Sequence, residues 1–123
     1  MKIADLSRSS GLTAHTIRYY ERIGLMPYAA RNDAGHRDYG AETLTWITFI
    51  GHMKAAGMPI AEMLRYARLR KQGDATAPQR AAMLRTRRDQ VARQIAALND
   101  TLSVLDAKID TYDRQEKTDD DIR

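Results

Sequence analysis

The chain contains no cysteine. This absence excludes a structural disulfide, a thiolate metal site, a cysteine-ligated iron–sulfur cluster and a thiol redox switch. Histidine is also scarce, and His15, His36 and His52 are far apart in the sequence. Because a zinc site usually needs four ligands, commonly cysteine and histidine, the sequence predicts no metal site and no bound cofactor.

Long apolar runs are missing as well. No segment approaches the roughly 20 apolar residues that a membrane-spanning helix needs. Asp5 and Arg8 interrupt the segment where a signal peptide would be apolar. We therefore expect a cytoplasmic protein with no membrane partner. No nucleophile–base set, paired carboxylates or phosphate-binding glycine loop is recognisable, so we expect no enzymatic activity.

The charge of the chain is unevenly distributed. The net charge of the 123 residues is +4. Residues 1–71 hold 11 basic and 6 acidic side chains, whereas residues 72–123 hold 9 and 10. The basic surplus therefore belongs to the N-terminal part. It indicates a polyanionic partner such as nucleic acid, with ordinary surface charge as the alternative.

The first 24 residues have the pattern of a helix-turn-helix. Apolar spacing predicts a helix over residues 3–9, and the Ser9-Ser10-Gly11 segment ends it. Thr13 is the expected N-cap of a second helix, because its hydroxyl can accept from a backbone amide of the first turn. That helix is expected to continue to Ile23 and to stop at Gly24. Helix, glycine-bearing turn and helix together favour a DNA-binding motif.

The second of these helices carries groups suited to nucleic acid. Arg18 can place two donors on a phosphate or a guanine edge. Tyr19 and Tyr20 offer hydroxyls to phosphate oxygens, and His15 and Thr16 lie in the first turn, where a recognition helix usually meets bases. Two structural alternatives remain open. Tyr20 could be mainly a core residue, and Arg18 could pair with the acidic residue three positions later.

A short hairpin is expected after this helix. The sequence Asn32-Asp33-Ala34-Gly35 is a turn, and its flanking arms carry Arg31, His36 and Arg37. An isolated hairpin is barely stable in water, so this wing must pack on the helices. Tyr28 and Tyr39 are the side chains that we expect to make those packing contacts.

Two further helices are expected over residues 41–56 and 59–71. The first has a wide apolar face, as a core helix should. Gly57 ends it, and Pro59 suits the first turn of the next helix. In the latter helix we expect four side chains to point inward: Ile60, Met63, Leu64 and Ala67.

The C-terminal half is predicted to be one long helix. Residues 72–78 read as a linker, 79–113 as a coiled-coil helix and 114–123 as a flexible acidic tail. The helix carries a heptad seam with one polar interruption at Arg88. The seam would be about 43 Å long, and nothing else in the chain could cover it. A second chain is therefore expected to do so, with an intramolecular helix pair as the alternative. The predicted dimerisation residues are Leu84, Val91, Ile95, Leu98, Leu102, Leu105, Ile109 and Tyr112.

Several of these motifs resemble one known family. The sequence Thr16-Ile17-Arg18-Tyr19-Tyr20-Glu21, then Gly24-Leu25, then Gly35-His36-Arg37-Asp38-Tyr39 is similar to the DNA-binding domain of the MerR family of bacterial transcription regulators. The similarity covers residues 1–71 and continues along the long helix to Tyr112. It implies a mainly α fold with a winged helix-turn-helix domain over residues 1–71, followed by the dimerising helix.

The resemblance also implies partners and a mechanism. Members are homodimers held by an antiparallel coiled coil, and each subunit places its winged domain on half of a pseudo-palindromic operator. The operator lies in an overlong promoter spacer, which the activated dimer bends and untwists so that RNA polymerase reads both promoter elements. By this resemblance Thr16, Arg18, Tyr19 and Tyr20 match helix contacts, Arg37 and Tyr39 match wing contacts, and Lys54 matches a phosphate contact. Residues chosen from their chemistry alone are added to these matches. The full candidate DNA-binding set is Thr13, His15, Thr16, Arg18, Tyr19, Tyr20, Arg31, Arg37, Tyr39 and Lys54.

The chain departs from the sensors of that family. Metal and redox sensors use cysteines, which are absent here, and no length remains for a large drug-binding domain. The short tail resembles a subgroup associated with aldehyde or general stress responses, in which a cysteine stands near the position of His52. A lone helical histidine is more often structural than functional. The sequence thus identifies no inducer, and it leaves one other class open: a coiled-coil architectural or chaperone-like protein with an incidental basic head.

Overall fold

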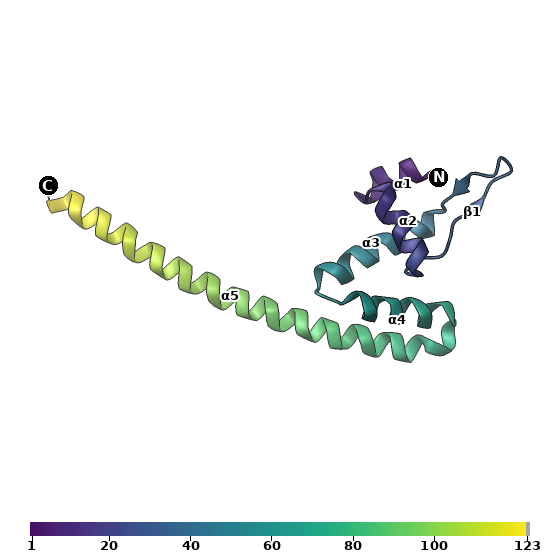
Figure 1. The fold of residues 1–123 in the computed structure, drawn as a ribbon. Coiled ribbons are helices and arrows are strands. Elements are labelled where there is room, and N and C mark those ends of the chain that lie inside the picture. The colour runs from purple at the N-terminus through teal and green to yellow at the C-terminus, as the bar shows by residue number, and fades with distance from the viewer. Residues whose placement is uncertain (123) are drawn as a thin grey trace. The chain divides into compact units, whose positions relative to one another are not determined.

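The computed structural model describes residues 1–122, with side chains as far as residue 117. The fold is mainly helical, as predicted, and it divides into a first unit, Met1–Leu84, and a second unit that begins at Arg85. We call the first unit the head. The elements follow in the order α1 (Ile3–Ser10), α2 (Ala14–Ile23), β1 (Ala30–Arg31), β2 (Arg37–Asp38), α3 (Ala41–Ala55), α4 (Ile60–Lys71), the 3-10 helix η1 (Asp74–Thr76) and α5 (Ala77–Ile122) (Figure 1).

The helix-turn-helix is confirmed, including the residues that bound it. The Thr13 side chain accepts from the backbone amide of Thr16 at 3.1 Å, so it caps α2 as predicted. Gly11 and Gly24 follow α1 and α2 with φ of 74° and 84°. These left-handed conformations cost glycine little and other residues more, which is why the two helices end there.

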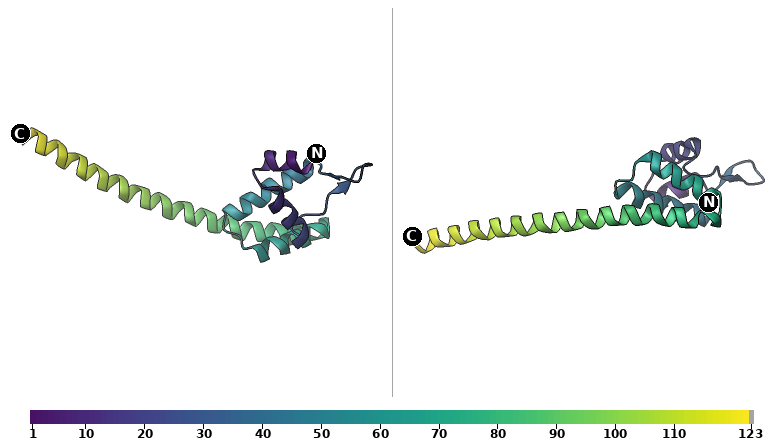
Figure 2. Two further views of the ribbon diagram at one scale, coloured as in Figure 1. Left: turned by 45° about the horizontal axis from the view of Figure 1, so that its top comes forward. Right: turned by 90° about the horizontal axis from the view of Figure 1, so that it is seen from below.

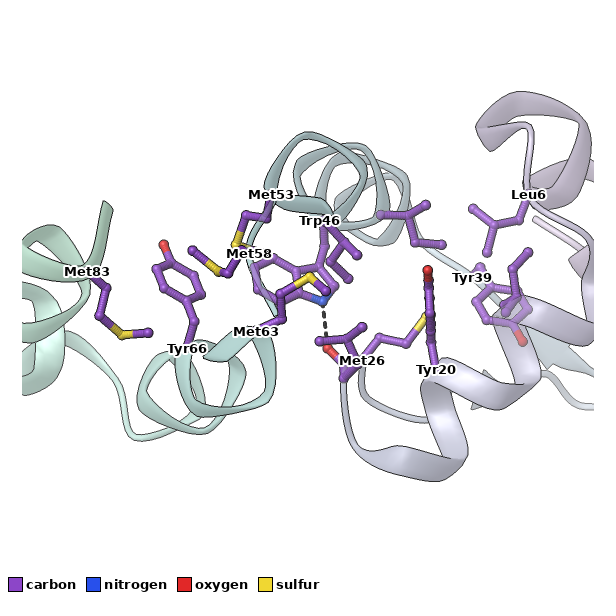
Figure 3. Close-up of a cluster of buried hydrophobic side chains, with 14 residues drawn as sticks. Leu6, Tyr20, Met26, Tyr39, Trp46, Met53, Met58, Met63, Tyr66 and Met83 are labelled. Carbon is purple, nitrogen blue, oxygen red and sulfur yellow. Dashed lines mark hydrogen bonds between the residues drawn. The ribbon is translucent and has the colours of Figure 1, made fainter. Parts of the chain in front are cut away.

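The core of the head joins all of its helices. Leu6 of α1, Ile17 of α2 and Ile50 of α3 are at most 1% exposed. Trp46 is held in one orientation, because its indole nitrogen donates to the Leu25 carbonyl at 3.0 Å (Figure 3). The remainder of the cluster is rich in flexible thioether side chains, which fill irregular gaps between helices. Five of them are buried: Met26, Met53, Met58, Met63 and Met83.

Two packing predictions for the head were wrong. Tyr28, expected to hold the hairpin, is 65% exposed, and Ile60, expected to point inward from α4, is 43% exposed. Ile60 is the first residue of α4. The position that closes this face is Tyr66, whose ring stacks on Trp46 at 6.0 Å and 16°. The apolar spacing of α4 had not singled out Tyr66.

The predicted linker is ordered structure. Residues 74–76 form η1, and Thr76 is 6% exposed. Its hydroxyl donates toward the Gly73 carbonyl and accepts from Arg80 Nε at 3.1 Å. Gly73, at φ 93°, makes the turn. The segment predicted as a linker thus joins α4 to α5 through an ordered turn, and polar composition alone does not reveal its local hydrogen bonds.

The long helix extends further in both directions than expected. It begins at Ala77 rather than at residue 79, with Pro78 in its first turn, where a missing amide costs nothing. It continues to Ile122, so the expected flexible tail at 114–123 is helical as far as it is described. Arg123 lies outside the described residues.

The apolar seam of α5 has two different environments. At its start, Leu84 packs against the core of the head. Val91 is half-buried. Beyond them the predicted side chains are 54–68% exposed: Ile95, Leu98, Leu102, Leu105, Ile109 and Tyr112. Within the described residues, no helix is long and apolar enough to cross a membrane.

Candidate nucleic-acid interface

The α2 helix carries most of the predicted contact residues on accessible positions. Thr13, His15 and Arg18 are exposed, and Thr16 is half-buried. Tyr19 is 40% exposed, with the Arg22 guanidinium 5.5 Å from its ring centre. The sequence left open an ion pair between Arg18 and Glu21, the acidic residue three positions later. The structure does not form this pair, because the Glu21 carboxylate lies inside the head.

Two predicted contact residues point inward. Tyr20 is 6% exposed within the core, and Tyr39 is 2% exposed. The Tyr39 hydroxyl is engaged inside the head, because it donates to the Glu21 carboxylate at 2.7 Å. Both rings thus support α2 and the wing from inside the head, and a direct contact of either hydroxyl with DNA stays a prediction.

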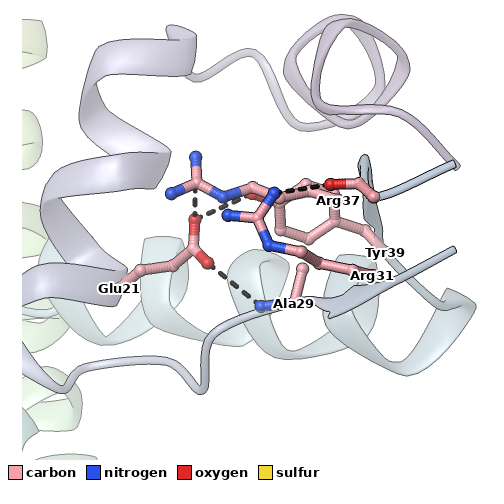
Figure 4. A network of polar contacts seen from close by, with 6 residues as sticks. Glu21, Ala29, Arg31, Arg37 and Tyr39 are labelled. Atoms are coloured by element: carbon pink, nitrogen blue, oxygen red, sulfur yellow. Dashed lines mark hydrogen bonds and ion pairs between the residues drawn. The ribbon is translucent and has the colours of Figure 1, made fainter.

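The residue that sequence reasoning missed is Glu21. It is 1% exposed on α2 and faces the base of the wing (Figure 4). Its carboxylate accepts from the Tyr39 hydroxyl at 2.7 Å and from the Ala29 amide at 3.0 Å, and Arg37 Nη1 lies 3.9 Å away. A buried carboxylate needs such partners, since leaving it unpaired would be costly. Glu21 therefore anchors both arms of the wing to the recognition helix.

The environment of Glu21 also changes the ionisation of Tyr39. Burial of the phenol, then its hydrogen bond to Glu21 and the negative charge of that carboxylate, raise the pKa of Tyr39 to about 12. Arg37 and Arg18 oppose this shift by their positive charge. Tyr39 is thus a stable donor to Glu21 throughout the physiological pH range.

The wing is a two-stranded antiparallel hairpin, as predicted, and it projects from the helices in every view (Figures 1 and 2). Ala30 pairs with Asp38, and Arg31 with Arg37. The Asn32 side chain accepts from the Ala34 and His36 amides at 3.0 and 3.1 Å, which closes the turn with Gly35 at φ 83°. Main-chain pairing of Tyr39 with Met1, at 2.7 Å, fixes the end of the wing to the chain before α1.

A basic concavity lies where α2, the wing and the first residues meet. It has a volume of about 430 Å³. Three of the predicted contact residues line it, as does His36 of the wing. Lys2 and Ile3 line it as well, although the contact prediction did not include them. The Arg31 guanidinium is held in place by donating to the Gly35 carbonyl at 2.7 Å (Figure 4). The full lining is Lys2, Ile3, Arg18, Arg31, His36 and Arg37. Cations from three segments thus converge on one space, and guanidinium and ammonium groups form charge-assisted hydrogen bonds with phosphate oxygens.

The remaining predicted residues lie near the end of α3. Lys54 is exposed one turn before Gly57, which has φ 83°. His52 is exposed and lies in the last turn of the same helix. Across the described residues, no group of three or more potential ligands from His, Asp and Glu could hold a metal ion. Sequence position alone could not show which of these side chains face solvent.

Comparison with known proteins agrees with this geometry. Two family models match the chain. The one described as "MerR HTH family regulatory protein" matches residues 1–69, and the one described as "MerR, DNA binding" matches residues 44–108. The chain is 43% identical over 91 residues to the HTH-type transcriptional regulator AdhR of Bacillus subtilis, covering 74% of this chain and 65% of that relative. It is 30% identical over 115 residues to YfmP of the same organism, covering 91% and 82%.

Solved structures show the same similarity over nearly the whole chain. A MerR family transcriptional regulator from Listeria monocytogenes has a TM-score of 0.86 and 41% identity, covering 98% of this chain and 95% of that one. HiNmlR, described as a MerR family regulator lacking the sensor domain and bound to promoter DNA, has a TM-score of 0.81 and 28% identity, covering 92% and 90%. The chain belongs to the MerR family of helix-turn-helix transcription regulators.

Proposed function

We propose that this protein is a DNA-binding transcription regulator that acts as a homodimer on a pseudo-palindromic promoter element. The observation that supports this most directly is the basic concavity between α2 and the wing. Phosphate contacts supply most of the affinity for a duplex, and a recognition helix beside them supplies sequence readout. Family membership and the promoter-bound structure of HiNmlR agree with the proposal.

We assign the contacts according to exposure. Arg18 is exposed on α2 and lines the concavity, so it can bind a phosphate or a guanine edge. His15, Thr16 and Tyr19 are neighbouring candidates on α2, with Thr13 at its start. On the wing, Arg31 and Arg37 line the concavity, and Lys54 is a separate phosphate contact. Tyr20 and Tyr39 support these residues from inside the head.

The second chain of the dimer is proposed to cover the seam of α5. Six apolar side chains between Ile95 and Tyr112 are more than half exposed. At roughly 25 cal/mol per Å² of apolar surface, covering such a stripe is strongly favourable. An antiparallel pair of these helices would give the molecule two basic heads. Two-fold symmetry of the protein then matches a pseudo-palindromic site in DNA.

Regulation is proposed to work by deforming DNA. If both heads bind half-sites inside an overlong promoter spacer, bending and untwisting that spacer would allow RNA polymerase to read both promoter elements. Smooth bending of a site of roughly 20–30 base pairs by about 40–90° costs on the order of 1–6 kcal/mol.

The alternative is a coiled-coil architectural or chaperone-like protein with an incidental basic head. Such a protein would need the exposed seam but not a guanidinium-lined concavity supported by a buried carboxylate. The arrangement of Arg31, Arg37 and Glu21 therefore favours the DNA-binding proposal.

Selection of binding sites from a random duplex library, followed by shift assays, tests the proposal. An inverted repeat should be selected, and Arg18→Ala should weaken binding to it by about 1–3 kcal/mol. Arg65→Ala, on an exposed position of α4 outside the concavity, is the control and should bind like the parent chain. Affinity should fall steeply with salt, because phosphate contacts release counterions. Selection of no repeat, or equal binding by both variants, would contradict the proposal.

A further inference from the structure

The head contains a second cavity that the DNA-binding surface does not use. Its volume is about 630 Å³, within the range of roughly 300–1,000 Å³ that is typical of small-molecule sites. It is formed by the end of α2, the connection from Gly24 to Tyr28, Trp46 of α3, and the last two turns of α4. We call it the α2–α4 pocket.

Two aromatic side chains line the α2–α4 pocket, one fixed in the core and one exposed to solvent. Trp46 is fixed by its hydrogen bond to the Leu25 carbonyl and by stacking on Tyr66. Tyr28, on the other hand, is 65% exposed although it lines the same space. Trp46 itself is buried, so the exposed ring of Tyr28 is the aromatic surface that the pocket offers to a ligand.

The polar part of the pocket is positively charged. The Arg70 guanidinium lies 4.2 Å from the Trp46 ring centre, and Arg22 and Lys71 also line the space. In the part of the chain that the structure describes, none of these three cations has an acidic side chain within ion-pair distance. The one acidic lining residue, Glu21, already accepts from Tyr39 and Ala29.

We propose that the α2–α4 pocket binds a small organic anion with an aromatic body. The ring would pack on Tyr28, and the carboxylate would accept charge-assisted hydrogen bonds from Lys71 and from Arg70, whose guanidinium lies over the Trp46 ring. A cation of the same shape would meet unneutralised positive charge and is excluded. This proposal is independent of the DNA-binding proposal, because none of the pocket's cations lines the basic concavity.

A matched set of three probes tests the charge requirement. The probes are 4-phenylbutyrate, 4-phenylbutan-1-ol and 4-phenylbutylammonium, which share one ring and chain. Trp46 is the single tryptophan of the protein, so its fluorescence reports binding in the pocket directly. The anion should give a saturable change with a Kd of about 1 mM or tighter. The alcohol should bind at least about ten-fold more weakly, and the ammonium should produce no saturable change.

Substitutions locate the anion. Arg70→Gln and Lys71→Gln should each weaken 4-phenylbutyrate binding, Arg70→Gln by about ten-fold. Arg68→Gln is the matched control, because Arg68 is exposed on the same helix and does not line the pocket. Since Arg70 touches Trp46, saturation-transfer NMR of the probe supplies a second readout for that variant. Lys71 is exposed, so Lys71→Gln tests the proposal even if Arg70→Gln lowers stability.

Three outcomes would overturn the proposal. Equal affinity for the three probes would show a pocket without charge selection. Equal effects of Lys71→Gln and Arg68→Gln would show that the anion is attracted only by general positive charge. Loss of probe binding at protein concentrations where sedimentation shows self-association would show that a second copy, rather than a small ligand, occupies the pocket.

Discussion

The head and the second unit use apolar side chains in opposite ways. In the head, Leu6, Ile17 and Ile50 are at most 1% exposed, because helices from different directions close over them. In the second unit, Leu98 and Leu102 are 68% and 55% exposed along one helix. Both regions have regular apolar spacing, yet only the head completes a core within one chain. The lesson is that periodicity predicts which face is buried, whereas the available neighbours decide whether one chain can bury it.

The largest expected effect is on the second unit. Leu98→Asp should abolish self-association, because each dimer would lose two apolar contacts and gain two carboxylates at the seam. Sedimentation equilibrium should show a monomer at concentrations where the parent chain is a dimer. The head should remain folded in this variant, as Trp46 fluorescence would show.

Val104→Asp is the control for this change. Val104 is exposed to the same 68% as Leu98 but lies off the heptad seam. If the seam is the interface, Val104→Asp should leave the dimer intact. An intact dimer in Leu98→Asp, or a dissociated one in Val104→Asp, would show that another surface holds the two chains together.

The next largest effect is expected inside the head. Ile50→Ala should lower the free energy of unfolding of the head by about 2–5 kcal/mol, because it removes buried methyl groups and leaves a cavity. Urea unfolding followed by Trp46 fluorescence measures this loss. Ile60→Ala, at a position that is 43% exposed, should cost less than about 1 kcal/mol. Similar losses in both variants would mean that the core does not end where the structure places it.

A smaller effect is expected at the base of the wing. Tyr39→Phe should cost about 1–2 kcal/mol at neutral pH, because buried Glu21 loses its shortest hydrogen bond. The folded-state pKa of Tyr39 is raised to about 12 from 10.0. Its contribution to stability is therefore complete below pH 10 and is lost as pH rises from 10 toward 12. The free energy of unfolding, measured across that pH range, should fall less steeply in Tyr39→Phe than in the parent chain. An unchanged slope would contradict the coupling between Tyr39 and Glu21.

The smallest effect is expected at the start of α2. Thr13→Ala should destabilise the head by about 1 kcal/mol, because the Thr16 amide loses its acceptor. Thr48→Ala, on an exposed position of α3, is the matched control and should change stability by less than about 0.5 kcal/mol. Equal losses in the two variants would show that the cap does not stabilise the head.

Local signals in the sequence predicted the helices of the head well. The Thr13 cap and the stops at Gly24 and Gly57 depend on one or two residues and their own backbone, so they can be recognised without the fold. Composition did not reveal the ordered turn around Thr76, since its hydroxyl bonds to carbonyls at Gly73 and Leu69 that only the fold brings close. For the interface, chemistry selected Arg18 and Arg37 as candidates, and only the structure showed that the rings of Tyr20 and Tyr39 are buried.

The sequence by itself determined the helix-turn-helix, the wing turn and the heptad spacing, because each follows from short-range backbone preferences and periodic hydrophobicity. Only the tertiary structure decided the role of Glu21, which lies 18 residues before the tyrosine that donates to it. It also decided that Arg70 stands over Trp46 beside an open pocket. Such pairings join residues from different elements, and their energies depend on burial that arises when those elements pack.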